Sequence, residues 1–257
     1  MDRRLALTTA AIVVATLAAA PRAQVSEAAE AAIMTALESG SADERAAAVV
    51  EVLRARSGTP SRALVLALAA ELARMNGVVA RRRIPAAPRS GSEWDTAAIG
   101  DYYGDLIQAN TLFESEATMI ALTGALQTGR MATNAVAAYG QRALPPVIRL
   151  LDDRAADAGE RAGAGRAIER MLLDGRLDGG SRRQVESLVA GVLARPEHFV
   201  VVIMAVEVAM ATKEPGLLAL VRRIADDPSA AQLDGRSADD PRARAMLQRS
   251  ARASLGR

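Results

Sequence analysis

Few side chains in this sequence are of the types that catalysis and metal binding use. The 257 residues include one histidine, His198, and no cysteine. Disulfides, cysteine nucleophiles, thiolate metal sites and clusters of histidine ligands are therefore excluded. Serine catalysis would depend on His198, and the chain contains no G-x-S-x-G motif. Because His198 precedes Phe199 at the start of an apolar stretch, we interpret it as a residue that caps or packs a helix.

Carboxylates are the remaining candidates for chemistry. The pairs Asp226-Asp227 and Asp239-Asp240 each precede a proline. A calcium loop needs further oxygen ligands at alternate positions, so we interpret both pairs as helix punctuation. The glycine patterns of phosphate and dinucleotide sites are also missing. The sequence thus predicts no catalytic residue, no metal and no cofactor. An all-helical hydrolase or lyase that uses carboxylates is the alternative.

A second group of residues has the types that dominate protein-binding hot spots, which are Trp, Tyr and Arg. The chain has few aromatic residues, and most of them follow a run of arginines and an irregular segment rich in proline. We predict that this region binds a partner through Arg81, Arg82, Arg83, Trp94, Tyr102, Tyr103 and Phe113. The alternative is that the aromatic residues fill a packing gap between an N-terminal unit and the rest of the chain.

The first 23 residues have the layout of a secretory signal peptide. Arg3 and Arg4 precede an uncharged apolar run over residues 5–20, and Pro21 and Ala23 follow it. The run is slightly shorter than the ~20 residues that span a bilayer. We therefore predict a signal peptide over residues 1–23 and a periplasmic or secreted protein. A retained N-terminal membrane anchor is the alternative.

Charge does not favour a polyanionic partner once this segment is removed. The whole chain has a formal net charge of +2 and a pI near 9.5. The segment holds three arginines and one aspartate, so the remaining chain has equal numbers of acidic and basic residues. We expect no nucleic-acid partner and no stable membrane span after cleavage. The arginines near the C-terminus could still contact an anionic surface, and these are Arg242, Arg244, Arg249, Arg252 and Arg257.

The rest of the sequence predicts an all-α fold without a sheet. Alanine, leucine and valine recur at three-and-four spacing, which is typical of amphipathic helices. Polar residues precede these runs, as Ser41 and Glu44 do in a capping-box pattern. We predict an N-terminal helical unit over residues 24–77, in which Gly77 ends the last helix. An irregular connection rich in Arg and Pro follows over residues 78–95, and a stack of helices with a basic last helix covers residues 96–257.

The sequence also contains a repeat of two helices in roughly 37 residues. Residues 131–153 align with residues 205–227, so that Val147 matches Val221 and Asp152-Asp153 matches Asp226-Asp227. In the first copy Pro145 and Pro146 open the second helix, where a missing amide costs little. We expect Asp152 and Asp153 to end that helix and to cap the next one.

The order of residues in this repeat resembles the HEAT repeat family. A glycine turn leads to a proline-opened helix, apolar positions, an aspartate, and then an arginine in the next helix. The matching residues are Gly140, Pro145, Val147, Ile148, Leu150, Leu151, Asp152 and Arg161. The resemblance implies a right-handed α-solenoid of stacked antiparallel helix pairs. It also implies a protein that binds or scaffolds other proteins and is not an enzyme.

Overall fold

The computed structural model describes residues 26–55, 60–82 and 96–256, and its regular elements there are all helices. This confirms the all-α prediction. The α-helices are α1 (Glu27–Ser39), α2 (Ala42–Ala55), α3 (Arg62–Arg82), α4 (Thr96–Thr111), α5 (Glu116–Thr123), α6 (Arg130–Ala138), α7 (Leu144–Asp152), α8 (Ala158–Leu173), α9 (Gly179–Leu193), α10 (Phe199–Thr212), α11 (Pro215–Asp226), α12 (Gly235–Ala238) and α13 (Pro241–Leu255). Short 3-10 helices lie at η1 (Leu126–Thr128), η2 (Gly140–Arg142) and η3 (Pro228–Ala230).

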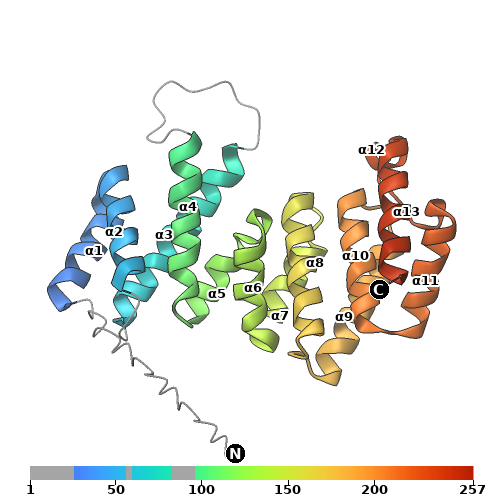
Figure 1. Ribbon diagram of the computed structural model, residues 1–257, viewed down its shortest axis with the longest axis horizontal. Coiled ribbons are helices and arrows are strands. Elements are labelled where there is room, and N and C mark those ends of the chain that lie inside the picture. Colours follow the sequence, from blue (N-terminus) through green and yellow to red (C-terminus); the bar gives the residue numbers. More distant parts are fainter. Residues whose placement is uncertain (1–25, 56–59, 83–95, 257) are drawn as a thin grey trace, which may run out of the picture.

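The helices form an elongated, helical-repeat-like body that runs from α1 to α13 (Figure 1). Alternate helices pack against each other in two rows. One row contains α1, α3, α5, α7 and α9, and the other contains α2, α4, α6, α8, α10 and α13. Successive helices contact each other across the rows, for example α7 with α8 and α9 with α10. At the C-terminal end α11 packs against both α10 and α13.

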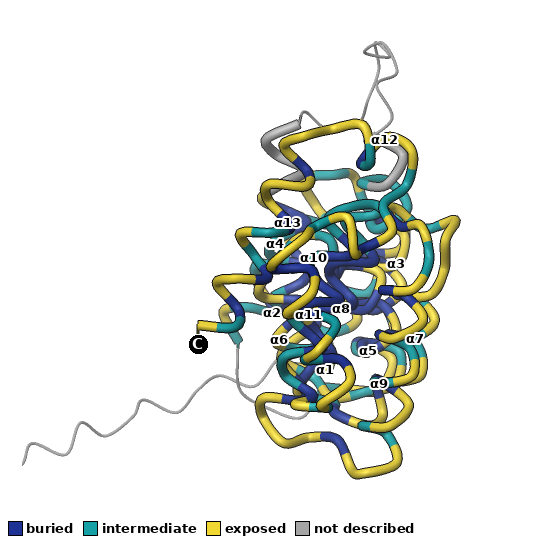
Figure 2. The backbone as a smooth tube through the Cα atoms, turned by 90° about the vertical axis from the view of Figure 1, so that its right-hand side faces the viewer, coloured by how far each residue is buried: buried dark blue, intermediate teal, exposed yellow. Residues whose placement is uncertain are grey.

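The core lies between the two rows. Viewed along the body, α2, α4 and α6 lie to one side, α3, α5, α7 and α9 lie to the other, and most of the buried backbone lies between them, where α8 and α10 are labelled (Figure 2). The buried side chains of α3 include Leu64, Leu68 and Leu72, which share one face at a spacing of four. Each buried leucine contributes about 1.5–3 kcal/mol of transfer free energy. Burial of one face on each helix therefore drives the stacking.

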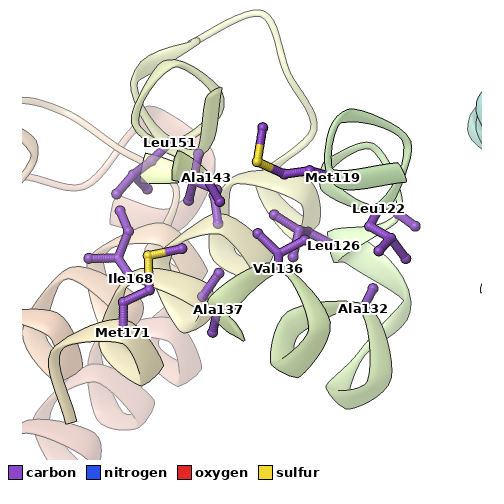
Figure 3. Packing of buried hydrophobic residues seen from close by; sticks show 14 of the residues in the cluster. Met119, Leu122, Leu126, Ala132, Val136, Ala137, Ala143, Leu151, Ile168 and Met171 are labelled. Carbon is purple, nitrogen blue, oxygen red and sulfur yellow. The ribbon is translucent and has the colours of Figure 1, made fainter. Parts of the chain in front are cut away.

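Many core positions carry small side chains, so neighbouring helices approach closely. In the middle of the body Val136 and Ala137 of α6 lie beside Leu126 of η1 and near Ile168 and Met171 of α8 (Figure 3). All five residues are buried. Alanine leaves room for the larger side chain of a facing helix, which allows large and small residues to interdigitate. The alanine-rich composition thus produces thin layers between the helices.

The helix boundaries agree closely with the repeat pattern. Pro145 and Pro146 lie in the first turn of α7, as predicted, and Pro215 opens α11 in the same way. The helices α7, α9 and α11 begin at residues 144, 179 and 215, which are about 35 residues apart. The aligned segments 131–153 and 205–227 therefore correspond to α6 with α7 and to α10 with α11.

The capping box that the sequence predicts from Ser41 and Glu44 is present before α2. Glu44 accepts a hydrogen bond from the Ser41 amide at 2.7 Å, and the Glu44 amide donates to the Ser41 hydroxyl at 3.4 Å. This confirms the capping box before α2.

Two local predictions differ from the structure. The helix α3 continues through Gly77 to Arg82, because the apolar face that includes Met75 and Val78 carries on past the glycine. Asp157, and not Asp152 or Asp153, caps α8 by accepting a hydrogen bond from the Gly159 amide at 2.8 Å. In the described part of the chain, no helix is both long and apolar enough to cross a membrane.

Candidate functional site

The predicted partner-binding residues do not gather on one accessible surface in the described structure. Tyr102 and Tyr103, in the middle of α4, are only 3% and 5% exposed. The Tyr102 hydroxyl donates a hydrogen bond to Glu71 at 2.7 Å, and the Tyr103 hydroxyl bonds to Asn76. Burial and the Glu71 carboxylate raise the pKa of Tyr102 far above its usual value. Both tyrosines thus tie α4 to α3 and present no face to a partner.

The other residues of that prediction are only partly described. Arg81 and Arg82 are the last residues of α3, but their side chains are outside the description, and Arg83 and Trp94 lie outside the described residues. Phe113 follows α4, is half-buried, and packs against the core. The packing alternative therefore fits Tyr102 and Tyr103.

A pocket of about 230 Å³ lies elsewhere in the molecule. It is formed where the three connections that precede α8, α10 and α12 meet. Its charged lining consists of Arg154, Arg161, Glu197 and Asp234. His198 and apolar atoms of Pro196 and two alanines complete it. The backbone of Glu197 pairs with that of Leu233 in an isolated parallel bridge, and the Asp234 amide donates to the Glu197 carbonyl at 2.9 Å. This pairing fixes the connection before α10 relative to the connection before α12.

A buried ion-pair network forms one wall of the pocket. Arg161 is 4% exposed and Glu197 is 3% exposed. The guanidinium of Arg161 donates two parallel hydrogen bonds to the Glu197 carboxylate, at 2.6 and 2.8 Å, and a third to the Leu151 carbonyl at 2.9 Å. Arg195 donates to the same carboxylate at 2.7 Å and pairs with Asp152 at 2.7 Å. Each charge of the network thus has a partner, which is what burial of charge requires.

The network keeps Glu197 ionised. Burial raises the pKa of its carboxyl group, but the hydrogen bonds from Arg161 and Arg195 outweigh burial and hold the pKa below its usual value. Burial likewise opposes ionisation of Asp234, and its hydrogen bonds with Ser237 together with the nearby His198 and Arg236 overcome that effect, so this pKa is lowered too. Neither carboxylate has the raised pKa of a general acid.

His198 is the N-cap of α10, which confirms its interpretation as a capping residue. Its Nδ1 accepts a hydrogen bond from the Val200 amide at 3.3 Å. In the neutral ring the proton is therefore on Nε2. The ring also lies against Phe199, with 4.8 Å between the ring centroids.

The paired aspartates act at helix starts. Asp227 accepts from the Ser229 amide at 2.9 Å and caps η3, and Asp240 accepts from the Arg242 amide at 2.8 Å and caps α13. Among the described residues, no three or more His, Asp or Glu side chains are grouped as metal ligands. The four arginines of α13 that the structure describes are exposed, and Arg252 donates to the Ala225 carbonyl at 2.9 Å. Arg257 lies outside the described residues.

Sequence reasoning did not find the pocket. Arg161 appeared in the repeat alignment and His198 as a cap, but Arg154, Glu197 and Asp234 carried no local signal. These three residues belong to separate connections that only the stacking of α8, α10 and α13 brings together. An alignment of the inter-helix connections with one another is the signal that could have pointed to them.

Comparisons with known proteins leave the site to be interpreted from its own geometry. No protein-family model, no curated protein and no solved structure matches the chain.

Proposed function

We propose that this protein is an exported, HEAT-like helical-repeat protein that binds or scaffolds another protein and is not an enzyme. The observation that carries the proposal is the packing of alternate helices in two rows. Each row presents the outward faces of successive helices over the length of the body. Extended faces of this kind are the surfaces that solenoid proteins use to bind macromolecules.

The details of the repeat support the HEAT-like assignment. Prolines lie in the first turns of both α7 and α11. Arg161 lies near the start of α8 and donates to the Leu151 carbonyl at the end of α7, and it also reaches Glu197 before α10. One side chain thereby connects two successive helix pairs. We propose a right-handed solenoid on the basis of the resemblance in sequence.

Export is proposed from the sequence of residues 1–23, which lie outside the described residues. A signal peptide predicts that the mature chain loses these residues and enters the periplasm or the medium. Cell fractionation followed by mass spectrometry of the mature N-terminus tests this. Recovery of the intact chain in the membrane fraction would instead support a retained anchor.

The pocket does not favour the alternative of a carboxylate-dependent hydrolase or lyase. Such an enzyme needs one carboxyl group with a raised pKa to act as an acid. The pKa values of Glu197 and Asp234 are both lowered, and Glu197 is occupied by two guanidinium groups. Binding is therefore the activity that we propose.

Site-specific photocrosslinking in cells tests the binding proposal. We would place a photoreactive residue at Leu66 of α3 and at Ile120 of α5, which are 46% and 56% exposed on adjacent helices of one row. Leu173 of α8, in the other row, is the matched position. One discrete protein adduct from one row is expected. The absence of an adduct from both rows contradicts the proposal, and adducts with lipid or polyanion that disappear at high salt would favour an anionic surface instead.

A further inference from the structure

We propose that the pocket between the ends of α8, α10 and α12 binds a small zwitterion. The anionic group would contact Arg154 and the cationic group would contact Asp234. This site is separate from the outward faces that we propose for protein binding, and the inference does not rest on that function.

Arg154 and Asp234 belong to the two connections that neighbour the middle one, which precedes α10. The connections precede α8, α10 and α12–α13, and α10 packs between α8 and α13. From the first connection, Nη2 of Arg154 approaches the Pro196 carbonyl at 3.5 Å. From the third, the Asp234 amide donates to the Glu197 carbonyl at 2.9 Å. The guanidinium of Arg154 and the backbone of Asp234 therefore both contact the connection before α10, and both residues line one pocket.

These two side chains differ in their partners from the other charged residues of the pocket. Arg161 and Glu197 are engaged with each other, and Glu197 is bonded to Arg195 as well. By contrast, among the described residues neither Arg154 nor Asp234 belongs to an ion pair. Arg154 has five N–H donors and uses one of them in a long hydrogen bond. Because the pKa of Asp234 is lowered, its carboxylate is ionised at neutral pH.

The arrangement disfavours a ligand with a single charge. A simple anion at Arg154 would share the pocket with the Asp234 carboxylate, and a simple cation at Asp234 would share it with the Arg154 guanidinium. A zwitterion pairs both groups at once and leaves the net charge of the pocket unchanged. The Nε2–H of His198 supplies a further donor in the lining. A volume of about 230 Å³ has room for one small molecule in place of several waters.

The lone histidine provides the readout. In a chain without a histidine tag, the two ring C–H groups of His198 give the imidazole signals of a carbon–proton NMR spectrum, and no other residue contributes to them. We would titrate glycine, 4-aminobutyrate and 6-aminohexanoate, which differ in the separation of their charges. Acetate and ethylammonium are the singly charged controls. At least one zwitterion is expected to shift the His198 signal with saturation in the millimolar range, and the single ions are expected not to saturate.

Two variants test the assigned contacts. Arg154→Gln changes an exposed side chain, and Asp234→Asn keeps a capping side chain before α12, so both variants should fold. Each is expected to weaken zwitterion binding about tenfold, as the loss of one charged contact does. Arg166→Gln, at an exposed position of α8 outside the pocket, is expected to change nothing. The proposal is wrong if no zwitterion saturates the signal, if acetate binds equally well, or if Asp234→Asn has no effect.

Discussion

Gly163 of α8 lies directly against the backbone of Leu126. A Cβ atom added to this glycine would be 2.3 Å from the Leu126 carbonyl oxygen and 2.6 Å from its carbonyl carbon. Real Cβ atoms are not found at such distances from backbone atoms, so the contact depends on the absence of a side chain. The glycine sets how closely α8 can pack against the turn before α6.

Replacing this glycine should separate the two segments. We predict that Gly163→Ala lowers the free energy of unfolding by about 1–3 kcal/mol, as overpacking does in a dense core. Gly191→Ala in α9 is the matched control, because its Cβ would meet nothing within 4 Å. That change should raise the free energy of unfolding by about 0.5–1 kcal/mol through helix propensity. Urea unfolding followed by circular dichroism measures both. Equal effects of the two changes would contradict the close contact.

The Arg161–Glu197 pair should be costly to break from either side. Arg161→Ala leaves a buried carboxylate with one remaining guanidinium, and Glu197→Ala leaves a buried guanidinium without a carboxylate. We predict a loss of about 3–5 kcal/mol in the free energy of unfolding for each single change. The double variant should lose less than the sum of the two, because its two sites share one interaction.

The exposed pair of Glu51 and Arg54 on α2 provides the comparison. Its side chains are 58% and 72% exposed, and Arg54 donates to Glu51 at 2.6 Å. Glu51→Ala should change the free energy of unfolding by less than about 1 kcal/mol, since solvent screens such pairs. If Glu197→Ala cost no more than this control, the buried network would not stabilise the fold as we infer.

The Glu197 carboxylate also predicts how the stability of the protein depends on pH. Its folded pKa lies below the ordinary value of 4.5, because the hydrogen bonds from Arg161 and Arg195 outweigh burial. The stabilisation is therefore present above pH 4.5 and is lost as the pH falls through the folded pKa. We predict that the urea midpoint of the wild type falls more steeply below pH 4.5 than that of Glu197→Gln. Parallel curves for the two proteins would contradict the lowered pKa.

The sequence predicted the elements well because their signals are local. Spacing predicted the all-α fold, and capping and proline residues placed the starts of two helices, as with Ser41 before α2 and Pro145 in α7. The prediction that Gly77 ends α3 was wrong, because tertiary packing of the α3 face outweighs the cost of one glycine to the helix. The tyrosines and the pocket could not be predicted, since burial of Tyr102 and proximity of Arg154 to Asp234 depend on how separate helices stack. A residue type that is frequent in binding sites is equally suited to a core when its hydroxyl finds a partner.

Tyr102 distinguishes a packing role from a binding role. Tyr102→Phe removes the hydroxyl that donates to Glu71 and leaves that carboxylate held by Arg74 at 2.6 and 2.7 Å. We predict a loss of about 1.5–3 kcal/mol in the free energy of unfolding, which is typical of a hydrogen bond to a charged group. Asn134→Ala, at an exposed position of α6, should change it by less than about 0.5 kcal/mol.

A measurement of how well each folded variant captures a partner completes this comparison. Folded Tyr102→Phe should capture a partner as well as the wild type does, because the ring is buried between α3 and α4. Trp94→Ala tests the aromatic residue of the same prediction that lies outside the described residues, and it should weaken capture without a loss of stability if that region binds. Capture that falls in Tyr102→Phe while its free energy of unfolding stays unchanged would restore Tyr102 as a contact residue. A variant that loses stability and keeps capture assigns Tyr102 to the core, where its hydroxyl joins two helices.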